Sequence, residues 1–276
     1  MKRRKLLRYT GASLLTAFGT AWASGWQATQ AQTGNSLSVR WLGHTCFLFT
    51  GNNQRVLVNP FRAIGCTAGY RLPNVQADVV LISSQLFDEG AVEGLPGNPK
   101  ILYEPGVYQF NGIQYQGIRT NHDTVGGRRF GTNVAWRWTQ GGLNILHLGG
   151  AAAPIEIEQK ILMGKPDLLL LPVGGGSKVY NPNQAIEAIK SLNPKMVIPT
   201  HYRTQAADDK SCDIVGVEEF LKLTDGSGIS VRNINSDSIT ISTADLPANG
   251  STVNILSYQF NSVPVAPKPV APKKGS

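Results

Sequence analysis

The chain has 276 residues, of which 41% are hydrophobic and 16% are charged, and its formal net charge is +8. This composition excludes an intrinsically disordered protein, and the length is enough for one large domain. The first 31 residues hold five basic residues and no acidic ones. Because the rest of the chain is close to neutral, the basic excess does not indicate nucleic-acid binding.

Residues 1–31 have the organisation of an export signal. Arg3-Arg4 precedes Leu6-Leu7 and Arg8, and a weakly apolar stretch then leads to small residues ending at Ala31. This pattern is similar to a twin-arginine signal, which carries a folded chain to the periplasm or to an equivalent lumen such as that of the thylakoid. An ordinary secretory signal and an uncleaved anchor remain alternatives. No apolar run reaches the roughly 18–20 residues of a spanning helix, so we expect no stable membrane span.

Between residues 36 and 260 we expect one domain that begins with strands and continues with alternating strands and helices. Apolar runs predict strands over 39–42, 46–49, 56–58 and 79–82, and hairpins that turn at Asn111-Gly112 and Gly141-Gly142. Helices are predicted over 154–163, from Pro182 onward and over 215–223, with strands at 168–171, 196–198, 239–241 and 255–256. This order indicates a layered α/β domain. Residues 261–276 are rich in Pro and Lys and predict a disordered tail.

Three cysteines are too few for a disulfide scaffold. Cys46 lies in an apolar strand and is expected to be buried. Cys66 and Cys212 lie in loop-like segments and could pair in an oxidising compartment, although the sequence alone leaves the pairing open.

The four histidines are the first candidates for chemistry. They are His44, His122, His147 and His201, and all but His122 lie at the ends of predicted strands or in the turns that follow them. Functional groups in α/β folds collect at strand ends, although a single histidine is more often structural than catalytic.

Six segments in order resemble the metallo-β-lactamase superfamily, and most closely its lactonase-like and phosphodiesterase-like branch. They are 39–44 with Gly43-His44, 56–61, His122-Asp123 with the loop to Asn133, His147 to Gly150, 170–175 and 198–202 with His201. The resemblance implies a four-layer αββα sandwich.

The sequence departs from that family at the positions of the metal ligands. Where the family has His-x-His-x-Asp-His, this chain has Ser84, Leu86, Asp88 and Glu89, so only the Asp is kept. Gly150 replaces the Asp that would bridge two metals. His122 and His201 are retained. The resemblance therefore implies that the first metal is lost and that a two-metal mechanism is excluded.

Two hypotheses follow for function. In the favoured one the chain is an exported, non-catalytic relative that binds a small-molecule ligand or a protein partner, without nucleic acid and without a metal. In the alternative, Asp88, Glu89 and His201 hold one divalent ion of zinc, iron or manganese. The protein would then hydrolyse a lactone, an ester or a phosphodiester.

The same hypotheses assign the other candidate residues. Asp88 and His122 are the predicted catalytic residues, with His122 positioning substrate or water. His44, Arg128 and Arg129 are predicted to contact the ligand, and the two arginines could clamp an anionic group. A solvated loop is the simpler interpretation of the arginine pair.

Overall fold

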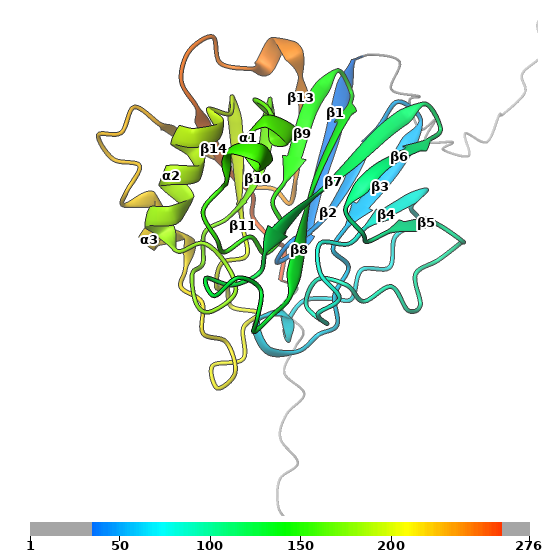
Figure 1. Cartoon of the computed structure of the whole chain (residues 1–276), viewed down its shortest axis with the longest axis horizontal. Helices are drawn as coiled ribbons and strands as arrows, with labels where there is room; N and C mark the ends of the chain where they lie inside the picture. The colour runs from blue at the N-terminus through cyan, green and yellow to red at the C-terminus, as the bar shows by residue number, and fades with distance from the viewer. Residues whose placement is uncertain (1–34, 261–276) are drawn as a thin grey trace, which may run out of the picture. The chain divides into compact units, whose positions relative to one another are not determined.

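Two mixed β-sheets stack against each other in the computed structural model, which describes residues 35–260 (Figure 1). The six-stranded sheet has the order β13 (Ser238–Ser242), β1 (Ser36–Gly43), β2 (Cys46–Gly51), β3 (Gln54–Val58), β4 (Val79–Leu81) and β5 (Lys100–Leu102). The eight-stranded sheet has the order β12 (Ser230–Asn233), β14 (Thr252–Ile255), β11 (Met196–Thr200), β10 (Leu168–Pro172), β9 (Leu143–His147), β8 (Thr132–Gln140), β7 (Ile113–Asn121) and β6 (Gly106–Phe110). The predicted signal and tail lie outside the described residues.

The core lies between the sheets, because alternate residues of the strands on each side are apolar and point inward. Phe49 of β2 packs edge-on against Trp138 of β8, with ring centroids 5.0 Å apart. Trp136, also on β8, is fully buried and donates its indole N–H to the carbonyl of Ile82 at 2.9 Å. These contacts join the two sheets.

Three α-helices lie beside the eight-stranded sheet: α1 (Ile157–Met163), α2 (Pro182–Leu192) and α3 (Val217–Leu221) (Figure 1). The helix α2 begins as predicted, because the side chain of Asn181 accepts a hydrogen bond from the backbone of Gln184 at 3.0 Å and Pro182 fills the first helical turn. Two short 3₁₀ turns, Gly65–Thr67 and Thr243–Asp245, complete the elements of residues 35–260. The described residues contain no helix long and apolar enough to cross a membrane.

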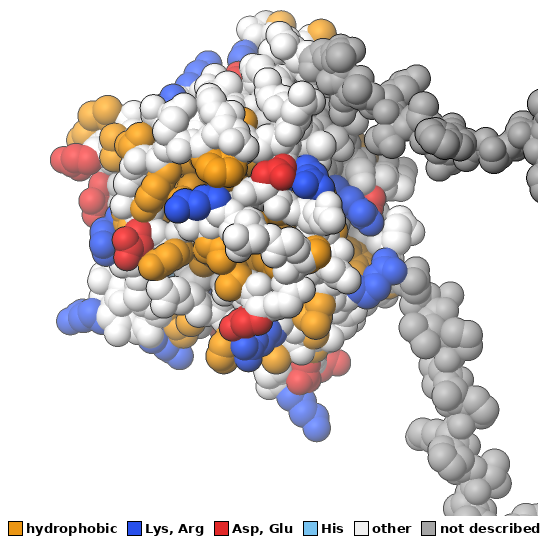
Figure 2. Space-filling model, turned by 90° about the vertical axis from the view of Figure 1, so that its right-hand side faces the viewer, with side chains coloured by type: hydrophobic (Ala, Val, Ile, Leu, Met, Phe, Trp, Pro, Cys, Tyr) orange, Lys and Arg blue, Asp and Glu red, His pale blue; other side chains and the backbone are white. Residues whose placement is uncertain are grey.

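The α/β sandwich predicted from the sequence is confirmed. All α-helices of the described part lie on one side, whereas Ser38, Arg40 and Thr50 leave the outer face of β1 and β2 partly open to solvent. On the side where β4 and β5 lie, apolar side chains form small groups interrupted by charged ones (Figure 2). The strands β5 and β12 were not predicted, because three or four residues are too few to show a period.

A disulfide between Cys66 and Cys212 joins two loops that are 146 residues apart in sequence, while Cys46 stays reduced and buried. Cys66 lies in the loop that follows β3, and Cys212 lies in the loop that follows β11. The open question about this pair is thereby answered in favour of pairing. The bond crosslinks segments from both sheets.

Removing this crosslink is expected to lower the free energy of unfolding by about 2–4 kcal/mol, because the bond restricts the unfolded chain. The measurement is urea unfolding of the wild type and of Cys66→Ala/Cys212→Ala, each with and without dithiothreitol. The reductant should destabilise the wild type to the level of the double variant and leave that variant unchanged. Equal stability of all four samples would contradict the prediction.

Candidate metal centre

The four histidines come from four different strand ends, and all are buried to within 1% of full burial. His44 lies in the turn between β1 and β2, His122 follows β7, His147 ends β9 and His201 follows β11. Stacking of the two sheets brings the ends of these strands to one edge. Burying an imidazole is costly unless its ring nitrogens have partners, so the partners of each ring indicate its role.

His147 has a structural role. Its Nε2 donates to the carbonyl of Thr45 at 3.1 Å, and its Nδ1 accepts the backbone N–H of Gly149 at 3.0 Å. One nitrogen donates and the other accepts, so the ring is a neutral imidazole with both nitrogens used. His147 therefore ties β9 to the β1–β2 turn and has no nitrogen left for a ligand.

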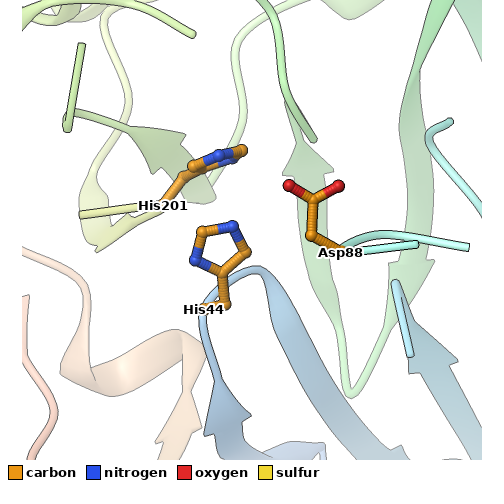
Figure 3. Close-up of side chains that lie close together, drawn as sticks. All are labelled: His44, Asp88 and His201. Atoms are coloured by element: carbon orange, nitrogen blue, oxygen red, sulfur yellow. The ribbon is translucent and has the colours of Figure 1, made fainter. Parts of the chain in front are cut away.

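His44, Asp88 and His201 form the one cluster of metal-ligating side chains found among residues 35–260 (Figure 3). One ligand atom from each lies within 4.8 Å of the others. The two imidazole rings have centroids 4.0 Å apart, and Asp88 reaches them from the loop after β4. The cluster thus combines both sheets, since His44 and Asp88 belong to the first and His201 to the second.

Buried nitrogens of this cluster have no hydrogen-bond partner. Both ring nitrogens of His44 are in this state, whereas the Nδ1 of His201 has the Oε1 of Glu89 3.2 Å away without the alignment of a hydrogen bond. A buried polar atom without a partner costs on the order of 1–3 kcal/mol, so such atoms mark sites that a ligand satisfies. Two imidazoles and one carboxylate fit a divalent ion, with coordination positions left over.

The backbone at both histidines is held in the left-handed region, with φ of 53° at His44 and 51° at His201. Conformations of this kind cost on the order of 1–3 kcal/mol for a residue other than glycine, and they concentrate at functional sites. Gly43 before His44 has φ of 114°, and a Cβ there would lie 2.6 Å from the ring of Tyr70. The Gly-His turn therefore needs its glycine in order to point the imidazole inward.

The electrostatic environment keeps His44 neutral. Burial is the main cause, and the neighbouring His201 adds to it, so the pKa of His44 falls to about 3. A metal ligand must be the neutral imidazole. His44 is thus prepared for an ion at neutral pH.

Glu89 and His122 form a second buried unit beside the cluster. The Oε2 of Glu89 accepts from Ser84 Oγ at 2.8 Å and lies 3.0 Å from His122 Nε2. The Nδ1 of His122 lies 2.8 Å from the carbonyl of Lys178. Because both ring nitrogens face acceptors, both must carry protons, and His122 is an imidazolium paired with the Glu89 carboxylate.

The pKa shifts of the two groups agree with this pairing. Burial alone would lower the pKa of His122, but the charge and hydrogen bond of Glu89 outweigh it and raise that pKa. Burial alone would raise the pKa of Glu89, and His122 outweighs it in turn, so that this pKa lies well below its usual value.

Gly150 explains how the imidazolium fits. A Cβ at this glycine would lie only 2.1 Å from Cε1 of His122. The ring therefore fills the space into which any side chain at position 150 would project, including the bridging Asp that the family resemblance places there. At the positions that hold the first metal in the family, Ser84 already donates a hydrogen bond to Glu89, and the side chain of Leu86 has no atom that could bind a metal. These two positions therefore do not form the family's first metal site.

Asp88 has a partner of its own, because Lys178 Nζ donates to its Oδ2. Burial alone would raise the pKa of Asp88, but the ammonium of Lys178 outweighs it and the pKa is lowered. The Asp88 side chain is 15% exposed, whereas His44 and His201 are 1% exposed. The cluster is thus reached from solvent on the side of Asp88.

The structure groups the predicted site residues differently from the expected ligand set. Asp88 and His201 lie together, but the third member of the cluster is His44, which was predicted to contact the ligand. Glu89 lies 3.2 Å from His201 Nδ1 without the alignment of a hydrogen bond and serves His122 instead. The one signal in the sequence for His44 was its place in a Gly-His turn.

Arg128 and Arg129 lie in the exposed loop that surrounds Asp123. The carboxylate of Asp123 accepts four backbone N–H groups, those of Val125, Gly127, Arg129 and Phe130, at 2.7–2.9 Å. Arg128 donates to the carbonyl of Val125, and the guanidinium of Arg129 stacks on Phe130. Arg129 also lines a pocket of about 260 Å³ with Ser177 and Asn181. The anion clamp stays a prediction.

The chain is similar in sequence and in fold to proteins of one superfamily. The model of the beta-lactamase superfamily domain matches residues 38–201. A metal-dependent hydrolase from Thermococcus onnurineus is 28% identical over 215 residues, which cover 68% of this chain and 92% of that protein. One from Thermus thermophilus is 29% identical over 197 residues, which cover 61% and 84%. A crystal structure of a metallo-beta-lactamase superfamily protein from Thermotoga maritima superposes with a TM-score of 0.62 at 27% identity, and the match covers 80% of this chain and 98% of that one.

Gly150→Ala is expected to destabilise the fold by about 1–3 kcal/mol or more, because the new methyl group overlaps the ring of His122. The measurement is the free energy of urea unfolding in a cycle of Gly150→Ala, His122→Ala and the double variant. Gly150→Ala should lower the free energy of unfolding much less in the His122→Ala background, where the ring is absent, than in the wild type. Equal costs in both backgrounds would show that the ring does not fill this space.

Stability is expected to fall as the pH decreases from 6.5 to 4.5. Burial lowers the pKa of His147 to about 4, as it lowers that of His44 to about 3. In this window the unfolded chain binds protons that the folded chain does not, and each histidine contributes a slope of at most about 1.4 kcal/mol per pH unit. His122 has a raised pKa, so its effect lies above pH 6.5.

Urea unfolding of chelator-treated protein across this window tests the pH dependence. In His147→Gln, which can still donate to Thr45, the free energy of unfolding should change less steeply with pH. The difference in slope should correspond to about one bound proton. A variant slope equal to that of the wild type would contradict the assignment of His147 as a neutral buried ring.

Proposed function

Because the chain belongs to the beta-lactamase superfamily, we propose that it is a hydrolase that works with one divalent metal ion, held by His44, Asp88 and His201. The observation that carries this proposal is the set of buried imidazole nitrogens without partners beside a carboxylate. The relatives named as metal-dependent hydrolases support the same chemistry. Zinc, iron and manganese all accept two nitrogens and one oxygen as ligands.

A bound ion would lower the pKa of a water molecule and polarise the carbonyl or phosphoryl group of the substrate. The substrates that fit this chemistry are small lactones, esters and phosphodiesters, in which water adds to the acyl or phosphoryl centre and an alkoxide leaves as the alcohol. His44 and His201 are sealed from solvent, so the substrate approaches over Asp88 and Lys178. Arg128 and Arg129 are candidates for contacts to its outer part.

His122 acts in this proposal as a positioning residue. It is fully buried, and both of its nitrogens donate, so it has no free nitrogen with which to take a proton from water. Its charge instead fixes Glu89 beside His201, where a carboxylate can orient the imidazole.

The second candidate function is a non-catalytic binder of a small molecule or a protein partner. It is favoured by the internal pairs His122–Glu89 and Lys178–Asp88, which occupy groups that would otherwise serve metals. A fold of this kind alone does not decide between enzyme and binder.

Export by the twin-arginine route to a periplasm or an equivalent lumen remains part of the proposal. The Cys66–Cys212 bond supports it, since disulfides form and persist in oxidising compartments.

The deciding experiment is elemental analysis of the full chain purified from its native compartment, followed by hydrolysis assays on chromogenic ester, lactone and phosphodiester substrates. We expect about one ion per chain in the wild type and loss of both ion and hydrolysis in His201→Ala and Asp88→Asn. Asp78→Asn is the matched control, because Asp78 pairs with Arg55 away from the cluster. This variant should keep its ion.

Two outcomes would contradict the proposal of a hydrolase with one metal ion. A wild type without a stoichiometric ion and without hydrolysis would favour the binder. Two tightly held ions would contradict the single-ion site.

A further inference from the structure

Lys178 approaches the candidate metal centre from the loop between β10 and α2, and two of its groups contact the site. Its carbonyl lies 2.8 Å from Nδ1 of His122, and its ammonium donates to Oδ2 of Asp88. The first contact fixes the backbone of residue 178 to a buried imidazolium. The second contact depends only on a long side chain that is 22% exposed.

This arrangement lets the ammonium move while the loop stays in place. The backbone is tied to His122, and the adjoining Gly175 and Gly176 adopt φ of 70° and 76°, which set the turn. The lysine side chain has four rotatable bonds and an open path to solvent. Leaving Asp88 would therefore not require unfolding of the loop.

The ammonium and a metal ion compete for the same carboxylate. Asp88 is the only anionic member of the cluster with His44 and His201. A divalent ion among these three residues would lie next to the positive charge of Lys178, which would repel it. In addition, the ammonium already occupies Oδ2 of Asp88, so an ion that uses both oxygens of this carboxylate must displace it.

We propose that Lys178 is a resident cation that holds Asp88 in the metal-free protein and that an entering ion must displace. Its side chain thereby weakens and gates metal binding, and once displaced it presents a positive charge at the mouth of the site. This inference rests on the metal site of the proposed function.

The test is isothermal titration of the chelator-treated full chain with Zn²⁺. Lys178→Met keeps the length of the side chain and removes its charge, so the Kd for Zn²⁺ should fall at least about tenfold. Lys178→Gln is a second variant that retains polarity, and it should shift the Kd in the same direction. Lys190→Met is the matched control, because Lys190 pairs with Glu187 on the surface of α2. Its Kd should equal that of the wild type.

A wild type and a Lys178→Met variant that bind Zn²⁺ with the same Kd would overturn the role of Lys178 and leave the metal site standing. Absence of binding in the wild type and in every variant would overturn the metal site, and this inference with it. A crystal structure of the zinc-loaded wild type gives a readout without any variant. We expect Lys178 Nζ to have left Asp88, and an unchanged pair beside a bound ion would contradict the proposal.

Discussion

The buried pair of Glu89 and His122 is the interaction on which the rest of the site depends. It places a positive imidazolium where the resemblance to the family expects a metal, and it uses a carboxylate in place of the last histidine of the family motif. Breaking one member would leave an uncompensated buried charge, which costs several kcal/mol. The surroundings are consistent with this pairing, since Ser84 donates to the carboxylate and Gly150 makes room for the ring. The site is therefore an organised alternative to the family pattern.

Much of the fold could be predicted from the sequence, because its signals are local. Asn111-Gly112 marks a tight turn by conformational preference alone, and both residues have positive φ. The fully apolar run over 79–82 indicates a strand covered on both faces, as β4 is. The ends of elements were harder to predict. The helix α1 begins at Ile157 rather than at Pro154, since Glu156 takes the capping position.

The composition of the candidate site could be predicted only in part. Asp88 and His201 were identified by their places in the family motif, whereas His44 joined them because the two sheets stack with their edges aligned. The proximity of His44 to Asp88 and His201 depends on packing between segments that are far apart in sequence. Glu89 was expected among the ligands on the basis of its chemistry. It pairs with His122 instead, because the imidazole ring lies in the space that Gly150 leaves open. Family resemblance thus locates the site, and side-chain packing determines what each residue does there.

The cysteines show how the fold can select one covalent outcome. More than one pairing of the three is conceivable in the unfolded chain, yet Cys46 is sealed within β2 once the sheets have formed. The fold itself then brings Cys66 and Cys212 to a Cα separation of 4.8 Å. Oxidation after folding therefore has a single product and needs only an oxidant, with no isomerase to correct scrambled bonds.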